Sequence, residues 1–377
     1  MLKSFQVKNF KQFKDLTLDL SRVRDYRFGE DLICHAPQGD LVKTAVVFGR
    51  NASGKSNLCL AIMDVTFHLS DSKVGMDKYD FYLNADSESK VATFCYHFYL
   101  NGEDIIYEYD KESVDKVVRE VITVGNQIVI ERNGKEVNFS PENADKYGFQ
   151  SLQWDSFKEQ PLSVLKFITR NVPLTKNNPL RQLMNFATHM LLFTRVDFGN
   201  AFISPAFKVE KLHDYICRNN LIDDFQKFLK NAAVNEEIVE KTNDQGERLL
   251  YFKHKKDIPM VSVASSGTQA LLLQFYWLNE ISRKTSKASF VFVDEYDAFY
   301  HYELAERIYT LMRKNCPVQC ILTTHNTNLM SNKNGRPDTF LIITPDRVQS
   351  MADLTQREVR VGNNLEKLYM ANEFNVK

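Results

Sequence analysis

The stretch from Gly49 to Ser56, GRNASGKS, constrains the fold more than any other part of the sequence. It fits the pattern G-x-x-x-x-G-K-[ST], which binds phosphate groups when a strand precedes it and a helix follows it. TAVVF, just before the loop, is a short β-branched apolar run that is typical of a buried strand. After the loop, apolar residues recur at helical spacing: Leu58, Ala61, Ile62, Val65 and Leu69. An ordinary glycine turn would not require these features together, so the sequence predicts a phosphate-binding loop.

Each residue type in this loop has a physical role. Gly49 and Gly54 let backbone N–H groups surround phosphate oxygens, and the helix that starts near Gly54 directs its positive end at them. Lys55 is placed to reach the β- and γ-phosphates, and the hydroxyl of Ser56 can ligate Mg²⁺. We therefore expect ATP and Mg²⁺ as cofactors, with nucleotide contacts from Gly49, Arg50, Asn51, Ser53, Gly54, Lys55, Ser56 and Asn57.

Size and composition exclude several classes of protein. The 377 residues are enough for one large domain or two ordinary ones, and 48 basic residues balance 48 acidic ones. This neutral balance argues against a highly basic nucleic-acid binder, although a local patch could still bind nucleic acid. The six cysteines follow no framework, so buried free thiols are expected rather than a metal site or disulfides. The N-terminus lacks a signal-peptide core and no apolar run approaches a membrane span, so we expect a cytoplasmic protein.

The chain divides into four regions by its hydrophobic pattern. Residues 1–90 begin with one or two strands, continue through a polar stretch that includes HAPQGD and is expected to be irregular, and contain the phosphate loop. Residues 91–160 alternate with period two and turn at Asn101-Gly102 and Asn133-Gly134, which predicts an antiparallel β region. Residues 161–257 are mostly helical, including LSVLKFITRN, LRQLMNFATHMLLF and LIDDFQKFLKNAAV, and end in a polar strand pair. Residues 258–377 are predicted to form a second, C-terminal part of the nucleotide-binding domain.

Four further elements in this last region complete the predicted site. Ser265 and Gly267, in ASSGT, begin an apolar helix and form a second anion site. The buried strand FVFV ends in Asp294-Glu295, where one carboxylate can hold Mg²⁺ and the other can orient an attacking water. A further buried strand, QCILTT, ends at His325, which could sense or stabilise the γ-phosphate. Each element is common alone, but their order makes a joint signal.

In this order the sequence resembles the ABC-type ATPases, whose heads also drive SMC proteins, DNA-repair complexes and transporters. The resemblance identifies GRNASGKS as Walker A, ASSGT as the signature, FVFVDE as Walker B, YDAFYH as the D-loop and TTH as the H-switch. It implies that Ser265 and Gly267 contact the γ-phosphate of a nucleotide held by a second subunit. It also implies that Glu295 is the catalytic carboxylate and that His325 is the switch histidine. Ser56 and Asp294 are the oxygen donors placed to hold the metal.

The sequence is similar over nearly its whole length to the RloA/AbiLi-like ATPases, a phage-defence group related to AriA of PARIS and PtuA of Septu. The likeness rests on the Walker A region, the two hairpins after it, PLSVL, DIPMVSVASSGT, DEYDAFYH, TTHNTNLM, RPDTFLII and LEKLYMANEF. It implies an α/β P-loop ATPase of the ABC head type, with an antiparallel β subdomain and an inserted helical lobe.

The resemblance implies a dimeric ATP-hydrolysing sensor that regulates a separate effector, such as a nuclease, in abortive infection. Two alternatives stay open. One is an SMC- or RecF-like DNA-repair or DNA-binding ATPase, although no long coiled-coil arms are present. The other is a scaffold that holds ATP with little hydrolysis, because the signature and the D-loop depart from the usual residues. A transporter subunit fits the long insertion before the signature less well.

Overall fold

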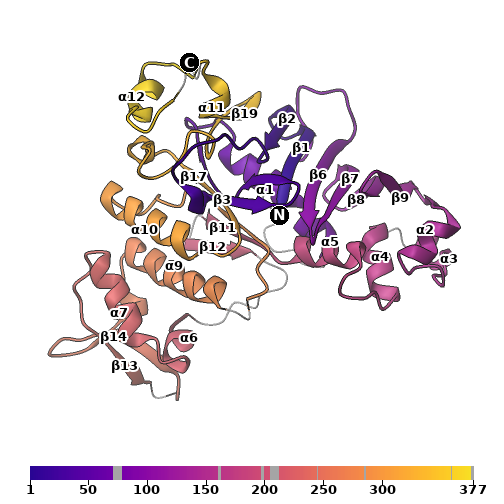
Figure 1. Cartoon of the computed structure of the whole chain (residues 1–377). Helices are drawn as coiled ribbons and strands as arrows, with labels where there is room; N and C mark the ends of the chain where they lie inside the picture. The colour runs from indigo at the N-terminus through magenta and orange to yellow at the C-terminus, as the bar shows by residue number, and fades with distance from the viewer. Residues whose placement is uncertain are drawn as a thin grey trace.

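The computed structural model describes residues 1–70, 79–159, 163–196, 199–203, 212–243, 245–283, 286–357 and 359–374. In this part of the chain, most strands belong to two seven-stranded sheets, one largely parallel and one antiparallel. Figure 1 shows helix α1 (Lys55–Leu69) in the middle of the molecule, close to strands of both sheets. The predicted α/β class with an antiparallel β subdomain is confirmed.

The central sheet has the strand order β12-β11-β16-β17-β5-β18-β19. Its inner strands are parallel, and the edge strands β12 and β19 run antiparallel to their neighbours. Its members are β5 (Thr44–Phe48), β11 (Met190–Val196), β12 (Gly199–Ile203), β16 (Phe290–Val293), β17 (Gln319–Thr324), β18 (Phe340–Thr344) and β19 (Arg347–Ser350). Because β5 and β17 are neighbours and β16 lies next to β17, the loops after these three strands meet at one edge of the sheet.

The second sheet is antiparallel, with the order β10-β9-β8-β7-β6-β1-β2. Its members are β1 (Leu2–Phe10), β2 (Phe13–Asp19), β6 (Ala92–Leu100), β7 (Glu103–Ser113), β8 (Lys116–Val124), β9 (Gln127–Asn133) and β10 (Glu136–Asn138). The predicted hairpins at Asn101-Gly102 and Asn133-Gly134 are confirmed. Asn101 and Gly102 both have positive φ, 48° and 93°, as a two-residue hairpin turn of the I′ type requires.

Helix α1 is sandwiched between the two sheets, so nearly all of its positions are buried. One face of the central sheet, including Ala45, Phe292 and Ile321, shares a hydrophobic core with α1 and the antiparallel sheet. The opposite face, including Val46 and Leu322, packs with helices α9 (Ser266–Ser282) and α10 (Tyr302–Asn315). The chain therefore forms layers, with the antiparallel sheet, α1, the central sheet and the pair α9–α10 following one another (Figure 1).

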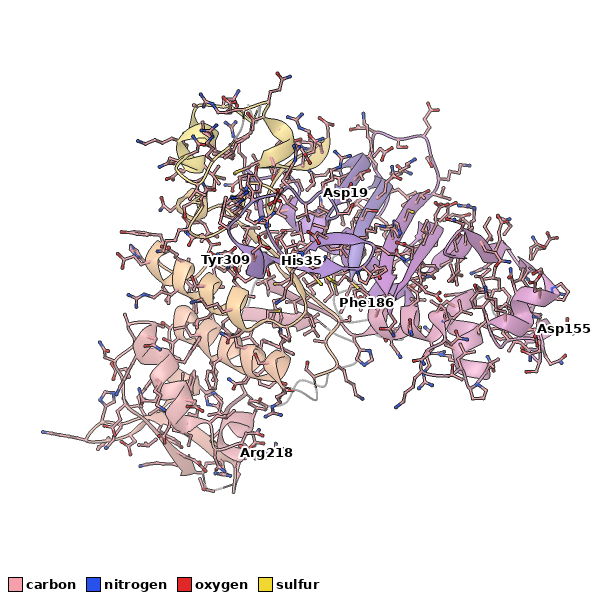
Figure 2. All side chains as sticks on the ribbon, in the orientation of Figure 1. Asp19, His35, Asp155, Phe186, Arg218 and Tyr309 are labelled. Atoms are coloured by element: carbon pink, nitrogen blue, oxygen red, sulfur yellow. The ribbon has the colours of Figure 1, made fainter. Side chains whose placement is uncertain are left out.

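Smaller elements extend this frame on both sides. Helices α4 (Val164–Asn171) and α5 (Pro179–Thr188) lie beside the antiparallel sheet, where Phe186, labelled in Figure 2, packs 5.1 Å from the ring of Phe98. The remaining elements are η1 (Glu30–Leu32), β3 (Ile33–Ala36), β4 (Gly39–Val42), α2 (Pro141–Lys146), α3 (Asp155–Glu159), α6 (Leu212–Arg218), α7 (Ile222–Asn231), β13 (Ile238–Thr242), β14 (Arg248–Phe252), β15 (Ile258–Pro259), α8 (Met260–Val263), η3 (Thr327–Leu329), α11 (Met351–Leu354) and α12 (Leu365–Met370).

Two expectations for the secondary structure are wrong. The predicted helix LRQLMNFATHMLLF ends at Thr188, and its last residues begin strand β11 in the central sheet. A short apolar run that is buried on both sides has no periodicity that separates strand from helix. The polar stretch through HAPQGD, expected to be irregular, is the β3–β4 hairpin. Leu162, in a predicted helix, and Asp244, in the predicted strand pair, lie outside the described residues.

The predicted helices and strand pair in the insertion before the signature are otherwise confirmed, as α4, α7 and the β13–β14 pair. The division of the chain at residues 90, 160 and 257 stays a prediction. Across the described residues, none of the helices combines the length and the apolar character needed to cross a bilayer.

Candidate active site

The loop predicted to bind phosphate joins strand β5 to helix α1, as expected, and its two glycines have no room for a side chain. A Cβ atom on Gly49 would lie 2.3 Å from Ser53 Oγ and 2.6 Å from Ile343 Cγ2. Gly54 has φ of 103°, and a Cβ there would lie 2.5 Å from Gln12 Nε2. These contacts require glycine at both positions, so the loop keeps its backbone N–H groups accessible at the start of α1.

Lys55 is the first residue of α1, and only 5% of it is exposed. Its Nζ donates to the carbonyl oxygens of Gly49 at 2.9 Å and Arg50 at 3.1 Å, and lies 3.3 Å from Nδ1 of His325. Burial lowers the pKa of Lys55, while the nearby carboxylates, Glu295 first among them, act in the opposite direction. All three ammonium protons therefore have acceptors within the loop and its neighbours.

Asp294 and Glu295 follow β16 and have different surroundings. Asp294 is buried and accepts hydrogen bonds from the hydroxyls of Thr323, at 2.7 Å, and Ser56. Burial raises the pKa of Asp294, and these two hydrogen bonds oppose that shift. A hydroxyl and a carboxylate already in contact are oxygen donors of the kind that Mg²⁺ takes, so Ser56 and Asp294 could hold the ion together.

Glu295 has an unusual backbone, with φ of 47°. Its N–H donates to Oγ1 of Thr323 at 2.7 Å, so the hydroxyl of the neighbouring strand supports this left-handed conformation. Its carboxylate lies 3.4 Å from Nε2 of His325. A lysine ammonium can only donate, so the tautomer of His325 with its proton on Nε2 would accept from Lys55 and donate toward Glu295. His325 thus links the two charged groups, 3.3 Å from one and 3.4 Å from the other.

A cavity of about 420 Å³ opens in front of these groups. It is lined by Gln12, Asn51, Ala52, Ser53, Gly54, Lys55, Ser56, Asn57, Glu295 and His325. Within the described residues, the buried Oγ of Ser53 has no hydrogen-bond partner in the structure. An unpartnered hydroxyl, glycine-dependent N–H groups and an ammonium facing one cavity match the donor set that a polyphosphate needs.

The signature residues do not line this cavity. Ser265 caps α9, accepting from the N–H of Thr268 at 3.2 Å, and is exposed. A Cβ on Gly267 would lie 3.2 Å from the carbonyl oxygen of Phe299, in the predicted D-loop. The structure therefore brings the phosphate loop, the acidic end of β16 and His325 together, and the signature residues are not among those that line their cavity.

Three residues near the site were not singled out from the sequence. Gln12, between β1 and β2, accepts from Nδ2 of Asn57 at 2.8 Å. Thr323 supports both Asp294 and Glu295, and Thr324 donates to the carboxylate of Asp297 at 2.6 Å. Burial raises the pKa of Asp297. The TTH run offered a signal for the two threonines, since adjacent hydroxyls ended a strand beside the acidic one. No sequence signal connected Gln12 to a loop far along the chain.

Comparison with solved structures finds several SMC head domains. That of Thermotoga maritima is 16% identical, with a TM-score of 0.43 over 95% of this chain and 99% of that chain. An SMC head bound to the C-terminal winged-helix domain of ScpA is 17% identical, with a TM-score of 0.48 over 93% of this chain and 97% of that chain. An SMC head with an extended coiled coil, bound to the C-terminal domain of ScpA derived from Pyrococcus furiosus, is 15% identical. Its TM-score is 0.48 over 100% of this chain and 99% of that chain. Among curated proteins, no match is found.

One family model matches the chain from residue 45 to residue 331, from β5 to just beyond His325. Its description reads "AAA domain, putative AbiEii toxin, Type IV TA system". The matched region holds the phosphate loop, the acidic end of β16 and the end of β17, which are the parts that build the cavity described above. Since the match spans most of the sequence, this α/β P-loop ATPase belongs to the AAA_21 family.

Proposed function

We propose that this protein binds Mg²⁺-ATP and hydrolyses it as a dimer, and that its nucleotide state regulates a separate effector protein in a bacterial antiviral defence system. The observation that carries the proposal is the convergence of Lys55, Glu295 and His325 on one cavity at the carboxyl ends of neighbouring strands, with the buried Asp294 bonded to Ser56 of the same cavity. A protein that only binds nucleotide would need the lysine and the loop. It would not require the carboxylate of Glu295 to be held in a strained conformation beside His325.

The nucleotide would lie with its phosphates in the loop formed by Gly49, Arg50, Asn51, Ser53, Gly54, Lys55, Ser56 and Asn57. Phosphate oxygens would replace the carbonyl oxygens of Gly49 and Arg50 as acceptors for the ammonium of Lys55. Ser56 and Asp294 would hold Mg²⁺, which neutralises charge on the phosphates when bound. Glu295 would accept a proton from the attacking water, and His325, whose Nε2 faces Glu295, would orient that carboxylate and contact the γ-phosphate.

A second copy of the chain would complete the site. Ser265 is exposed at the start of α9 and does not line the cavity of its own chain. A helix start with free N–H groups is a good partner for a γ-phosphate. Two chains related by a two-fold axis could therefore place Ser265 and Gly267 of one opposite Lys55 of the other, with ATP joining the subunits.

The defence role is supported by the family description, which names a toxin and a toxin–antitoxin system. The narrower likeness to RloA/AbiLi-like ATPases supports an effector on a separate chain, such as a nuclease. A nuclease or toxin gene in the neighbouring reading frame would support this part of the proposal. A chromosome-organising or repair partner gene there would favour the DNA-binding alternative instead.

A mixing experiment tests the dimeric site. Lys55→Ala should lose ATP binding, and Ser265→Arg should keep ATP at Walker A while blocking closure by size and charge. Neither variant should hydrolyse ATP alone, but their mixture should regain part of the wild-type phosphate release, because each heterodimer has one intact site. Ser151→Arg, at an exposed serine far from the signature in sequence, is the matched control and should behave as wild type. If the mixture stays inactive and ATP leaves light scattering unchanged, the trans-acting signature is wrong and the scaffold alternative gains support.

A further inference from the structure

Strand β17 ends in two threonines, and the second of them, Thr324, holds the backbone on both sides of His325. Thr324 is fully buried and lies opposite Phe48 of β5, the residue before the phosphate loop. Its Oγ1 accepts the N–H of Asn326 at 2.8 Å. Because this hydrogen bond spans His325, it fixes the short piece of backbone from which the ring of His325 projects.

The carboxylate of Asp297 orients this hydroxyl. Oγ1 of Thr324 lies 2.6 Å from Oδ2 of Asp297, and a hydroxyl has a single proton to donate. When that proton is donated to Asp297, the lone pairs of the oxygen are left to accept from Asn326. Without the carboxylate the hydroxyl is free to rotate, and the hydrogen bond that spans His325 is weakened.

Asp297 itself is placed by the turn that carries Glu295. The N–H of Ala298 donates to the carbonyl oxygen of Glu295 at 3.0 Å, which closes a tight turn around Asp297. The pair formed by Asp297 and Thr324 therefore ties this turn to the end of β17. These are the two pieces of backbone whose side chains, Glu295 and His325, meet at 3.4 Å in front of the cavity.

Stability explains a carboxylate at this position poorly. Asp297 is half-buried, and burial raises its pKa, while its hydrogen bond with Thr324 opposes that shift. Hydrogen bonds to neutral groups restore only part of the hydration that a carboxylate loses on burial, so its contribution to folding is small. The charge of Asp297 does interact with His325 and with Lys55. Its place is better explained by the groups that it holds.

We infer that Asp297 is a positioning residue that acts through Thr324 to hold the switch histidine, His325, in place for hydrolysis. This inference rests on the proposed function, in which His325 orients Glu295 and contacts the γ-phosphate. Asp297 is not among the residues that line the cavity. Its loss should therefore slow hydrolysis and leave the affinity for ATP unchanged.

The test is a double-mutant cycle on single-turnover phosphate release from Mg²⁺-ATP, with ATP affinity measured by calorimetry for each protein. Asp297→Ala should lower the release rate about 10- to 150-fold, the factor for loss of a hydrogen bond to a charged group. In the His325→Gln background the same change should lower the rate by less than about twofold, because the group that it positions is already gone. ATP affinity should stay the same in all four proteins.

Two further sets of variants support the cycle. Thr324→Val should be as slow as Asp297→Ala, and Thr324→Ser, which keeps the hydroxyl, should recover most of the rate. Asp110→Ala is the matched control, because the hydroxyl of Thr93 donates to Oδ1 of Asp110, also at 2.6 Å, in the antiparallel sheet. Asp110→Ala should release phosphate at the wild-type rate.

The outcomes separate this inference from the proposed function. A wild-type rate in Asp297→Ala, or an equal loss with and without His325, would overturn the positioning role and leave the ATPase standing. If Asp297→Ala does not fold, the two Thr324 variants decide, and equal rates in Thr324→Val and Thr324→Ser overturn the role. A loss of ATP affinity together with the rate would make Asp297 a structural residue and also overturn it. If the wild type releases no phosphate, the proposed function fails, and this inference fails with it.

Discussion

Loss of the Thr323 hydroxyl should slow hydrolysis, because this buried side chain supports the predicted catalytic carboxylate. It is fully buried at the end of β17, where its hydroxyl accepts from the N–H of Glu295 and donates to the carboxylate of Asp294, both at 2.7 Å. Thr323→Val keeps the shape of the side chain but removes both hydrogen bonds. The N–H of Glu295 would then be unpaired and the left-handed backbone of Glu295 unsupported.

The size of the effect follows from these contacts. An unsatisfied buried N–H costs about 1–3 kcal/mol, and a left-handed conformation costs a non-glycine residue about 1–2 kcal/mol. The free energy lost with this hydrogen bond is therefore comparable with the cost of the left-handed conformation. Without the bond, Glu295 should relax away from its position. A positional cost of about 1–3 kcal/mol corresponds to a fall in kcat of roughly 5- to 150-fold. ATP affinity should change little, because Lys55 and the loop are untouched.

The assay is steady-state phosphate release with ATP affinity measured in parallel by calorimetry. Thr323→Ser restores the hydroxyl and should recover most of the activity. Thr66→Val is the matched control: Thr66 is also fully buried, and its hydroxyl donates to the carbonyl oxygen of Ala187 at 2.9 Å, away from the cavity. A wild-type kcat in Thr323→Val would refute the idea that Thr323 positions Glu295.

Three further predictions concern binding and stability. Lys55→Ala should abolish ATP binding in calorimetry, because it removes the charge that meets the phosphates; unchanged affinity in a folded variant would contradict the phosphate-loop assignment. Lys111→Met should lower the free energy of unfolding, measured in urea, by about 3–5 kcal/mol, because it leaves the buried carboxylate of Asp64 without its ion pair. The control is Lys116→Met, which breaks an exposed ion pair and should cost only about 0–1 kcal/mol. Equal losses in the two variants would contradict this prediction. Burial lowers the pKa of His68 well below 6.5, so the unfolded chain takes up a proton there that the folded chain does not. The free energy of unfolding should therefore fall as the pH falls below about 6.5, and His68→Gln should make this fall with pH less steep. An equally steep fall in the variant would argue against this role of His68.

The parts of the fold that could be predicted depend on contacts close in sequence. The strand TAVVF, the loop and α1 are contiguous, so their pattern alone predicted them. The hairpin at Asn101-Gly102 follows from two residues that tolerate positive φ. Strand β11 was missed because its place beside β16 depends on partners a hundred residues away, and an apolar run fits both a buried strand and a helix.

The residues of the candidate site could likewise be predicted only in part from the sequence. Lys55, Asp294, Glu295 and His325 were identified because each ends a strand or starts a helix in a recognisable motif. The structure places Lys55, Glu295 and His325 around one cavity and Asp294 against Ser56, which lines the same cavity. Gln12 could not be identified, because its place at the cavity depends on the contact between the β1–β2 turn and Asn57 of α1. Long-range hydrogen bonds of this kind leave no period and no motif in the sequence.

In the proposed function, Glu295 accepts a proton from the attacking water and so makes this protein an ATPase. The most direct test is single-turnover phosphate release from Mg²⁺-ATP by the wild type and by Glu295→Gln, with ATP affinity measured for both. The glutamine keeps the size of the side chain but cannot accept the proton of the attacking water. We expect similar ATP affinity and a fall in the release rate of roughly two to four orders of magnitude. Equal release rates, or no release by the wild type, would contradict the claim.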